Sequence, residues 1–278
     1  MALIEKLAAI ANAIRSKTGK TDGLTLEQMP GEIEGIETGG VSEQDLLEAM
    51  ATRDWPSGDI VINAEKILDN AFVDRKKITS VIADNATELG YCAFSGCDSL
   101  LTADFPEVTI VNEKSLAYCT ALTTLNLPEL TTITGYNSFR ANKALTWMTL
   151  PKLAEFKGTV FYPWGEAKAL KVLDIGPALG NFKAGQAFIS GYGPIVLVLR
   201  YDGVCVLNSV ENVAGSVIRN GRGYLLIPSA HLEEYKVATN WSSLLGLGDE
   251  FLALEDYTVD GTVTGALDVV KIEELIAE

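Results

Sequence analysis

The sequence predicts a mixed α/β repeat fold, a solenoid in which short coils stack along one axis. One pattern recurs four times, over Leu89–Pro106, Ile110–Pro128, Ile133–Pro151 and a longer copy at Phe156–Pro177. The leucines that open the apolar run of each copy are 22, 23 and 25 residues apart: Leu100, Leu122, Leu145 and Leu170. A unit of this length cannot bury its own apolar face, so it must stack on a neighbour with the same pattern.

Each copy contains a short strand with one buried face. In the second copy Leu122, Leu125 and Leu127 alternate with the polar residues Thr124 and Asn126. Such alternation is typical of a strand that faces the core on one side and water on the other. Prolines follow the strands because proline cannot donate a ladder hydrogen bond: Pro106, Pro128 and Pro151.

Two further positions recur in the half-unit before each strand. One holds an aromatic residue or leucine at steps of 22, 22, 23 and 22 residues: Phe72, Phe94, Leu116, Phe139 and Phe161. The other holds Cys97 and Cys119, 22 residues apart, and then Asn142. We expect these cysteines to be reduced, buried thiols that stack on each other, with a disulfide as the alternative.

These repeats resemble the BspA-like leucine-rich repeats, whose units read as an aromatic residue, a small or Cys position, a leucine, and a strand that closes in Leu-Pro. The resemblance assigns residues 59–230 to the solenoid and predicts a C-terminal capping helix within 231–255. It implies no single function, because the family includes adhesins, surface proteins and phage tail proteins.

Charge and hydropathy exclude several classes of protein. No apolar run is long enough to span a membrane, and no separate apolar segment with a cleavage site opens the chain, so we expect neither membrane insertion nor export. The net charge of −15 argues against a nucleic-acid partner. Much of it lies between His231 and Glu278, with eleven acidic residues against two lysines. The acidic segment 256–278 is either a solvated tail or a docking surface for a basic partner.

The first 40 residues are predicted to form a helical module for docking or oligomerisation. Leu3, Leu7, Ile10 and Ile14 form one apolar stripe on a helix. This stripe is too short to act alone as a coiled coil, so we expect it to hold a homo-oligomer together, most simply a trimer. Residues 41–58 are predicted to contain a helix, which a capping box begins, and a linker.

Two segments resemble those of phage tail and baseplate proteins. They are Ile10–Ile36, similar to N-terminal segments of such proteins, and Tyr257–Asp268, similar to segments that end them. The resemblance implies a component of the virion tail whose N-terminus docks on other tail or baseplate proteins. It transfers no chemistry.

The sequence has no recognisable catalytic or cofactor-binding motif. The single histidine, His231, is at the expected start of the capping helix, and neither a G-x-S-x-G motif nor a phosphate-binding loop occurs. The cysteine spacing does not fit a zinc site. We therefore expect no enzymatic activity, no cofactor and no metal.

The sequence leaves a surface as the candidate functional site. Trp147, Tyr162 and Trp164 are its aromatic candidates, and exposed aromatic residues supply contact area in recognition. The polar row predicted to flank them contains Asn126, Thr149 and Asp174. The alternative for Trp147 is that the N-terminal module, the tail or a partner subunit covers it.

These observations predict a non-enzymatic tail fibre or receptor-binding protein that recognises a host surface protein or glycan. The alternative function is a bacterial surface adhesin of the same repeat class. A third hypothesis, an enzyme that acts on cell-wall glycans, needs a pair of carboxylates in a cleft, and the sequence does not single out such a pair.

Overall fold

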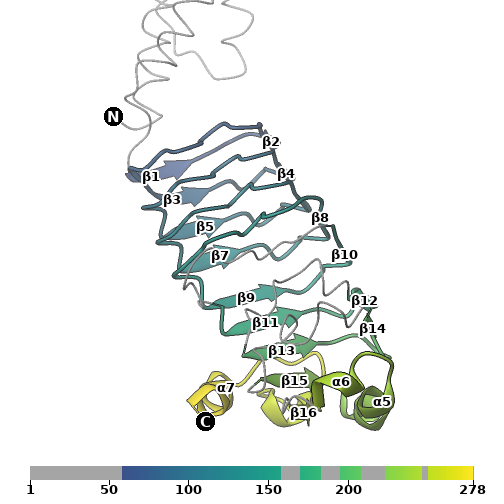
Figure 1. Cartoon of the computed structure of the whole chain (residues 1–278). Coiled ribbons are helices and arrows are strands. Elements are labelled where there is room, and N and C mark those ends of the chain that lie inside the picture. Colours follow the sequence, from purple (N-terminus) through teal and green to yellow (C-terminus); the bar gives the residue numbers. More distant parts are fainter. Residues whose placement is uncertain (1–57, 158–169, 183–194, 208–222, 246–249, 278) are drawn as a thin grey trace, which may run out of the picture.

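The computed structural model describes residues 58–157, 170–182, 195–207, 223–245 and 250–277. These residues form a solenoid in which most coils contribute a longer strand to one side and a short strand to the other (Figure 1). The predicted modules at 1–40 and 41–58 lie outside the described residues, apart from Gly58.

The longer strands form two parallel sheets that follow each other along the axis (Figure 1). The first has the order β1-β3-β5-β7, and the second has the order β9-β11-β13-β15-β16. Their bounds are β1 Gly58–Val61, β3 Ile78–Ile82, β5 Thr102–Asp104, β7 Thr124–Asn126, β9 Trp147–Leu150, β11 Val172–Ile175, β13 Val196–Leu199, β15 Tyr224–Ile227 and β16 Glu250–Ala253.

The short strands form the opposite wall. Five of them pair in the order β10-β8-β6-β4-β2, and β12 pairs with β14. Their bounds are β2 Lys66–Ile67, β4 Glu88–Leu89, β6 Ile110–Val111, β8 Thr132–Ile133, β10 Glu155–Phe156, β12 Asn181–Phe182 and β14 Val206–Leu207. Because every one of these pairs is parallel, equivalent residues of successive coils lie side by side.

The main core lies between these walls and uses the repeated positions that the sequence predicts. Leu100, Leu122 and Leu145 are buried, and Leu170 is half-buried. Phe72 and Phe94 stack with ring centroids 5.0 Å apart. The expected strand ladder is present where Met148 pairs with Leu173. Leu125 pairs instead with Ala103 in the first sheet and is only half-buried, because it lies in the strand that ends that sheet.

The described cysteines are buried, reduced thiols. The thiols of Cys97 and Cys119 lie 3.1 and 3.3 Å from the carbonyl oxygens of Phe72 and Phe94, one coil away. In the next coil Asn142 takes the slot, and its Oδ1 accepts a 3.0 Å hydrogen bond from the backbone of Cys119. Burial raises the pKa of Cys97 to about 12, so these thiols are structural at neutral pH.

The corner turn after each short strand has a repeated backbone conformation. Two residues per corner, four apart, have positive φ: Asn70 and Asp74, Cys92 and Gly96, Lys114 and Tyr118, Asn137 and Ala141. This conformation is unfavourable for residues other than glycine, and asparagine tolerates it best. The chain therefore reverses in the same way at each of these coils.

The C-terminal end of the solenoid is closed by short elements. After β15 follow η1 (Ser229–His231), α5 (Leu232–Val237) and α6 (Ser242–Leu245), and the chain then returns as β16 beside β15. Where the sequence predicted one capping helix over 231–255, the structure thus has two short helices and a further ladder strand. Trp241 is fully buried at this end of the core. Its indole N–H donates a 2.6 Å hydrogen bond to the Cys205 carbonyl.

Candidate recognition surface

Two rows of side chains point outward from the first long-strand sheet. The register aligns Asp59, Ser80, Thr102 and Thr124 in one row. It aligns Val61, Ile82, Asp104 and Asn126 in the other. Most of these side chains are exposed, and Val61 and Ile82 add apolar area at one end. We call these eight residues the outer rows.

Hydrogen bonds between neighbouring coils hold the polar groups of the outer rows in place. Asn126 Nδ2 donates a 2.7 Å hydrogen bond to Asp104 Oδ1. The hydroxyls of Ser80 and Thr79 lie 2.6 and 3.0 Å from Asp59 Oδ1, and these hydrogen bonds lower the pKa of Asp59. This carboxylate is therefore ionised at neutral pH, and it gives the first coil a fixed negative charge.

The same face of the second sheet is apolar and covered. Val172, Val196, Val198 and Leu226 point outward from β11, β13 and β15, yet all four are buried. They pack against the C-terminal segment 254–277, which contains η2 (Leu254–Tyr257) and α7 (Val269–Ala277). Figure 1 shows α7 beside the long strands of the last coils. This second core explains why these strands read as continuous apolar runs, a pattern typical of strands buried on both faces.

Two of the predicted surface residues belong to this covered half. Trp147 is half-buried and packs against the second core, which contains Val172 of the neighbouring strand and residues of the C-terminal segment. Asp174 was predicted to face solvent, but it is buried. The solvent-facing interpretation of Asp174 is wrong because a segment about 90 residues further along the chain covers this part of the sheet.

Asp174 holds the C-terminal segment in place through Arg200. The Arg200 guanidinium forms a two-point ion pair with the Asp174 carboxylate. Its Nη1 also donates hydrogen bonds to the carbonyl oxygens of Val263 and Gly265. These carbonyls lie in the Tyr257–Asp268 segment, which folds back on itself through an antiparallel bridge between Thr258 and Leu267. The segment that resembles phage tail ends thus has a structural role within this chain.

The remaining predicted residues divide between exposed and undescribed positions. Asn126 and Thr149 are exposed, and Asn126 belongs to the outer rows. Tyr162 and Trp164, and the stripe of Leu3, Leu7, Ile10 and Ile14, lie outside the described residues. The structure therefore brings Asn126 together with Asp104, and it places Trp147 against the second core and Asp174 under the C-terminal segment.

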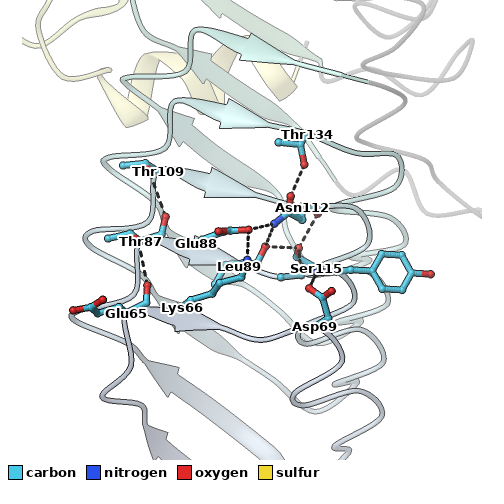
Figure 2. A network of polar contacts seen from close by, with 12 residues as sticks. Glu65, Lys66, Asp69, Thr87, Glu88, Leu89, Thr109, Asn112, Ser115 and Thr134 are labelled. Carbon is cyan, nitrogen blue, oxygen red and sulfur yellow. Dashed lines mark hydrogen bonds and ion pairs between the residues drawn. The ribbon is translucent and has the colours of Figure 1, made fainter.

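The short-strand wall has a polar network that the sequence analysis did not predict (Figure 2). Asn112 is at its centre: Nδ2 donates to Glu88 Oε1 at 2.7 Å and to the Leu89 carbonyl at 2.9 Å, and Oδ1 accepts from Thr134 at 2.6 Å. Lys66 extends it by an ion pair of 2.8 Å with Glu88. A row of threonines lies beside this network: the hydroxyls of Thr87, Thr109 and Thr131 each donate a hydrogen bond to a carbonyl of the preceding coil. Their spacing of 22 residues is the signal in the sequence that could have indicated polar contacts along this wall.

His231 immediately precedes α5, as the sequence predicts, and it lies between two carboxylates. Its Nε2 is 3.0 Å from Asp202 Oδ1 and its Nδ1 is 3.1 Å from Glu234 Oε2. The hydrogen bond to Asp202, followed by that to Glu234, raises the pKa of His231. This arrangement ties the capping helix to the preceding coil, and it lies at the opposite end of the solenoid from the first coils.

Two kinds of site are absent from the described residues. In that part of the chain, no three His, Cys, Asp or Glu side chains gather closely enough to hold a metal ion. No helix among the same residues has both the length and the apolar character needed to cross a membrane.

Comparisons with known proteins agree with the repeat pattern. Residues 57–170 match the BspA type leucine rich repeat region in six copies. A leucine-rich repeat protein of T. pallidum is similar in structure, with 16% sequence identity and a TM-score of 0.46 over 70% of this chain and 86% of that one. A leucine-rich repeat protein from Bacteroides ovatus has 15% identity and a TM-score of 0.26, and the match covers 72% of each chain.

No curated protein matches the sequence. The family match does not point to a phage tail. The strand ladder continues past residue 170, where the family match ends, to β16. Residues 57–170, less than half of the chain, thus match the BspA type leucine rich repeat pattern.

Proposed function

We propose that this protein is a non-catalytic recognition protein of the adhesin type, which binds a cell-surface macromolecule across the outer rows of β1 to β7. One observation carries the proposal. The outward face of the long strands is apolar and covered by the C-terminal segment in the second half of the solenoid, whereas its first half is polar and exposed. Solubility requires polar side chains on a surface, but it does not require hydrogen bonds that fix their orientation.

The geometry suits recognition of an extended surface. Neighbouring parallel strands place equivalent side chains about 4.8 Å apart, so the outer rows present carboxylate, hydroxyl and amide groups at a regular spacing. Asp104 and Asn126 are oriented by the hydrogen bond between them. Rigid positioning of polar groups lowers the entropy lost on binding.

The adhesin interpretation has more support than the phage tail interpretation. The repeats match a family that includes surface proteins among other classes. The Tyr257–Asp268 segment, which resembles the ends of tail proteins, has a structural role in this chain through its contact with Arg200. The tail interpretation now depends on Ile10–Ile36 alone. It remains a prediction, together with the virion location, the homotrimer and the docking on other tail proteins.

Cell binding tests the proposal. The labelled full-length chain is incubated with epithelial cells and with bacterial cells, and bound protein is measured by flow cytometry. Thr102→Arg and Thr124→Arg place a bulky charge on exposed positions of the outer rows, and Thr239→Arg makes the same change on an exposed turn near the capping helices.

We expect binding to epithelial cells that both outer-row variants lose and the Thr239→Arg control keeps. Binding to bacterial cells alone, with the same sensitivity, would support the tail interpretation. Equal binding by all three variants, or binding to neither kind of cell, would refute a role for the outer rows.

A further inference from the structure

The corner turns after the first four short strands form a second surface, separate from the outer rows. They comprise residues 69–77, 91–99, 113–121 and 136–144. These four turns contain six basic and four acidic residues, a net charge of +2, whereas the whole chain has −15. A basic strip on a strongly acidic protein marks a place where an anion is attracted locally.

Two exposed tyrosines stand at the same position of this corner. Tyr91 and Tyr136 are 40% and 58% exposed. They are the two exposed aromatic side chains among the described residues, and both lie at this corner. Backbone hydrogen bonds from Asn70 to Tyr91, from Cys92 to Glu113 and from Lys114 to Tyr136 align these residues coil by coil. The tyrosines are two coils apart, which corresponds to about 10 Å.

Cationic side chains lie beside the aromatic rings. Lys114 Nζ is 5.5 Å from the centroid of the Tyr91 ring and 3.5 Å from its hydroxyl. Arg140 lies over the Tyr118 ring at 5.3 Å. Both distances are those of a cation–π contact. Lys114 and Arg140 thus each place a positive charge over a tyrosine ring of this corner.

Most of the acidic groups of the corner already have partners within the protein. Asp69 accepts a 2.8 Å hydrogen bond from the backbone of Tyr91. Glu113 forms an ion pair of 3.0 Å with Lys114, and Asp98 is 3.5 Å from Lys76. Three of the four carboxylates are thus held by contacts within the protein, and Lys77 and Lys143 add exposed positive charge to these turns.

We propose that this corner surface binds an acidic polysaccharide with a repeating disaccharide. Tyr91 and Tyr136 stack on sugar rings one disaccharide apart, and Lys114 and Arg140 pair with the carboxylate or sulfate groups of the glycan. The separation of the two rings, about 10 Å, fits a disaccharide repeat better than an acidic peptide. A nucleic acid has one phosphate for every nucleotide, whereas hyaluronan has one carboxylate for every two sugars, so the net charge of −15 opposes a nucleic acid more strongly. This site goes beyond the proposed function, because it uses other residues on another edge.

Calorimetric titration of the full-length chain with hyaluronan and chondroitin sulfate oligosaccharides tests this site. We expect Tyr91→Ala with Tyr136→Ala to weaken binding on the order of tenfold, and the corresponding phenylalanine variants to retain it because the ring remains. Lys114→Gln should weaken binding and reduce its dependence on salt. Lys152→Gln removes the same charge from a lysine that pairs with Glu129 elsewhere on the solenoid, and it should bind normally.

Three results would overturn the proposal. One is the absence of binding to either acidic glycan. Another is binding to polyglutamate or oligo(dT) that is as tight as binding to glycan and insensitive to both tyrosine substitutions. The third is equal binding to a neutral chitin oligosaccharide that Lys114→Gln leaves unchanged. Glycan binding by Thr102→Arg and Thr124→Arg should equal that of the unmodified chain, so failure of the outer-row proposal and failure of this one are distinguishable.

Discussion

Arg200 and Asp174 form a buried two-point ion pair that links the second long-strand sheet to the C-terminal segment. Arg200 Nε is 2.7 Å from Asp174 Oδ1, and Nη2 is 3.0 Å from Oδ2. The side chains are only 11% and 6% exposed. The third nitrogen of the guanidinium, Nη1, holds the carbonyls of Val263 and Gly265. One side chain therefore joins residues of the sheet to a loop more than 60 positions away.

Removal of Arg200 should be strongly destabilising. Arg200→Ala leaves the Asp174 carboxylate buried without its partner, and loss of one member of a buried ion pair costs about 3–5 kcal/mol. Denaturant unfolding measures the free energy, and limited proteolysis shows whether residues 254–277 are released first. Arg200→Lys should not restore stability, because lysine lacks the planar fork of donors. A change below about 1 kcal/mol would mean that the pair contributes no more than a surface ion pair.

The corner turns allow a matched test of backbone conformation. Gly96 and Ala141 occupy the same corner position, with φ of +78° and +59°. Gly96→Ala should cost more than about 1 kcal/mol, because the conformation is unfavourable for alanine and the new Cβ would collide with Asp74 Oδ1. Ala141→Gly should be neutral or stabilising, contrary to the usual effect of this substitution. Thermal melting of both variants measures these changes in stability. An equally large loss of stability for both variants would contradict the repeated conformation.

The strand face can be tested in the second copy of the repeat. Leu122 is fully buried, so Leu122→Ala should cost about 2–5 kcal/mol through the cavity that it leaves. Leu125 is half-buried, and Leu125→Ala should cost less. Thr124→Ala is a change at an exposed position and should stay within about 0.5 kcal/mol. Denaturant unfolding should give this order, and an effect of Thr124→Ala as large as that of Leu122→Ala would mean that the face assignment is inverted.

The capping helix should become less firmly held as pH rises. The pKa of His231 is raised above its ordinary value of about 6.5 by Asp202 and Glu234. Folding therefore favours the protonated form, and this contribution to stability is complete below the unfolded pKa and lost as pH passes through the folded pKa. The difference in melting temperature between the unmodified chain and His231→Gln should shrink between about pH 6 and pH 8. A constant difference across that range would exclude the ion pairs as its cause.

The repeat pattern contained enough information to predict the coils. Leu100, Phe94 and Cys97 recur at a nearly constant spacing, and each is buried in its expected slot. These positions are predictable because each coil buries its apolar side chains against identical neighbours, so a local pattern is sufficient. The positive-φ corners and the Asn112 network were not predicted, because they depend on backbone geometry and on polar contacts between coils.

The outward face could not be predicted in the same way. Thr124 and Asp174 are both polar residues in short strands, so these positions by themselves do not distinguish an exposed site from a covered one. The local signal is in the neighbouring strands β13 and β15, whose continuous apolar runs are typical of burial on both faces. The difference arises because residues 254–277 fold back over β11 to β15 and leave β1 to β7 uncovered. Burial of Asp174 therefore depends on Arg200 and Val263, which are distant in the sequence and meet this strand only in the folded chain. A repeat determines its own core, whereas the exposure of its outer surface depends on which distant segment packs on it.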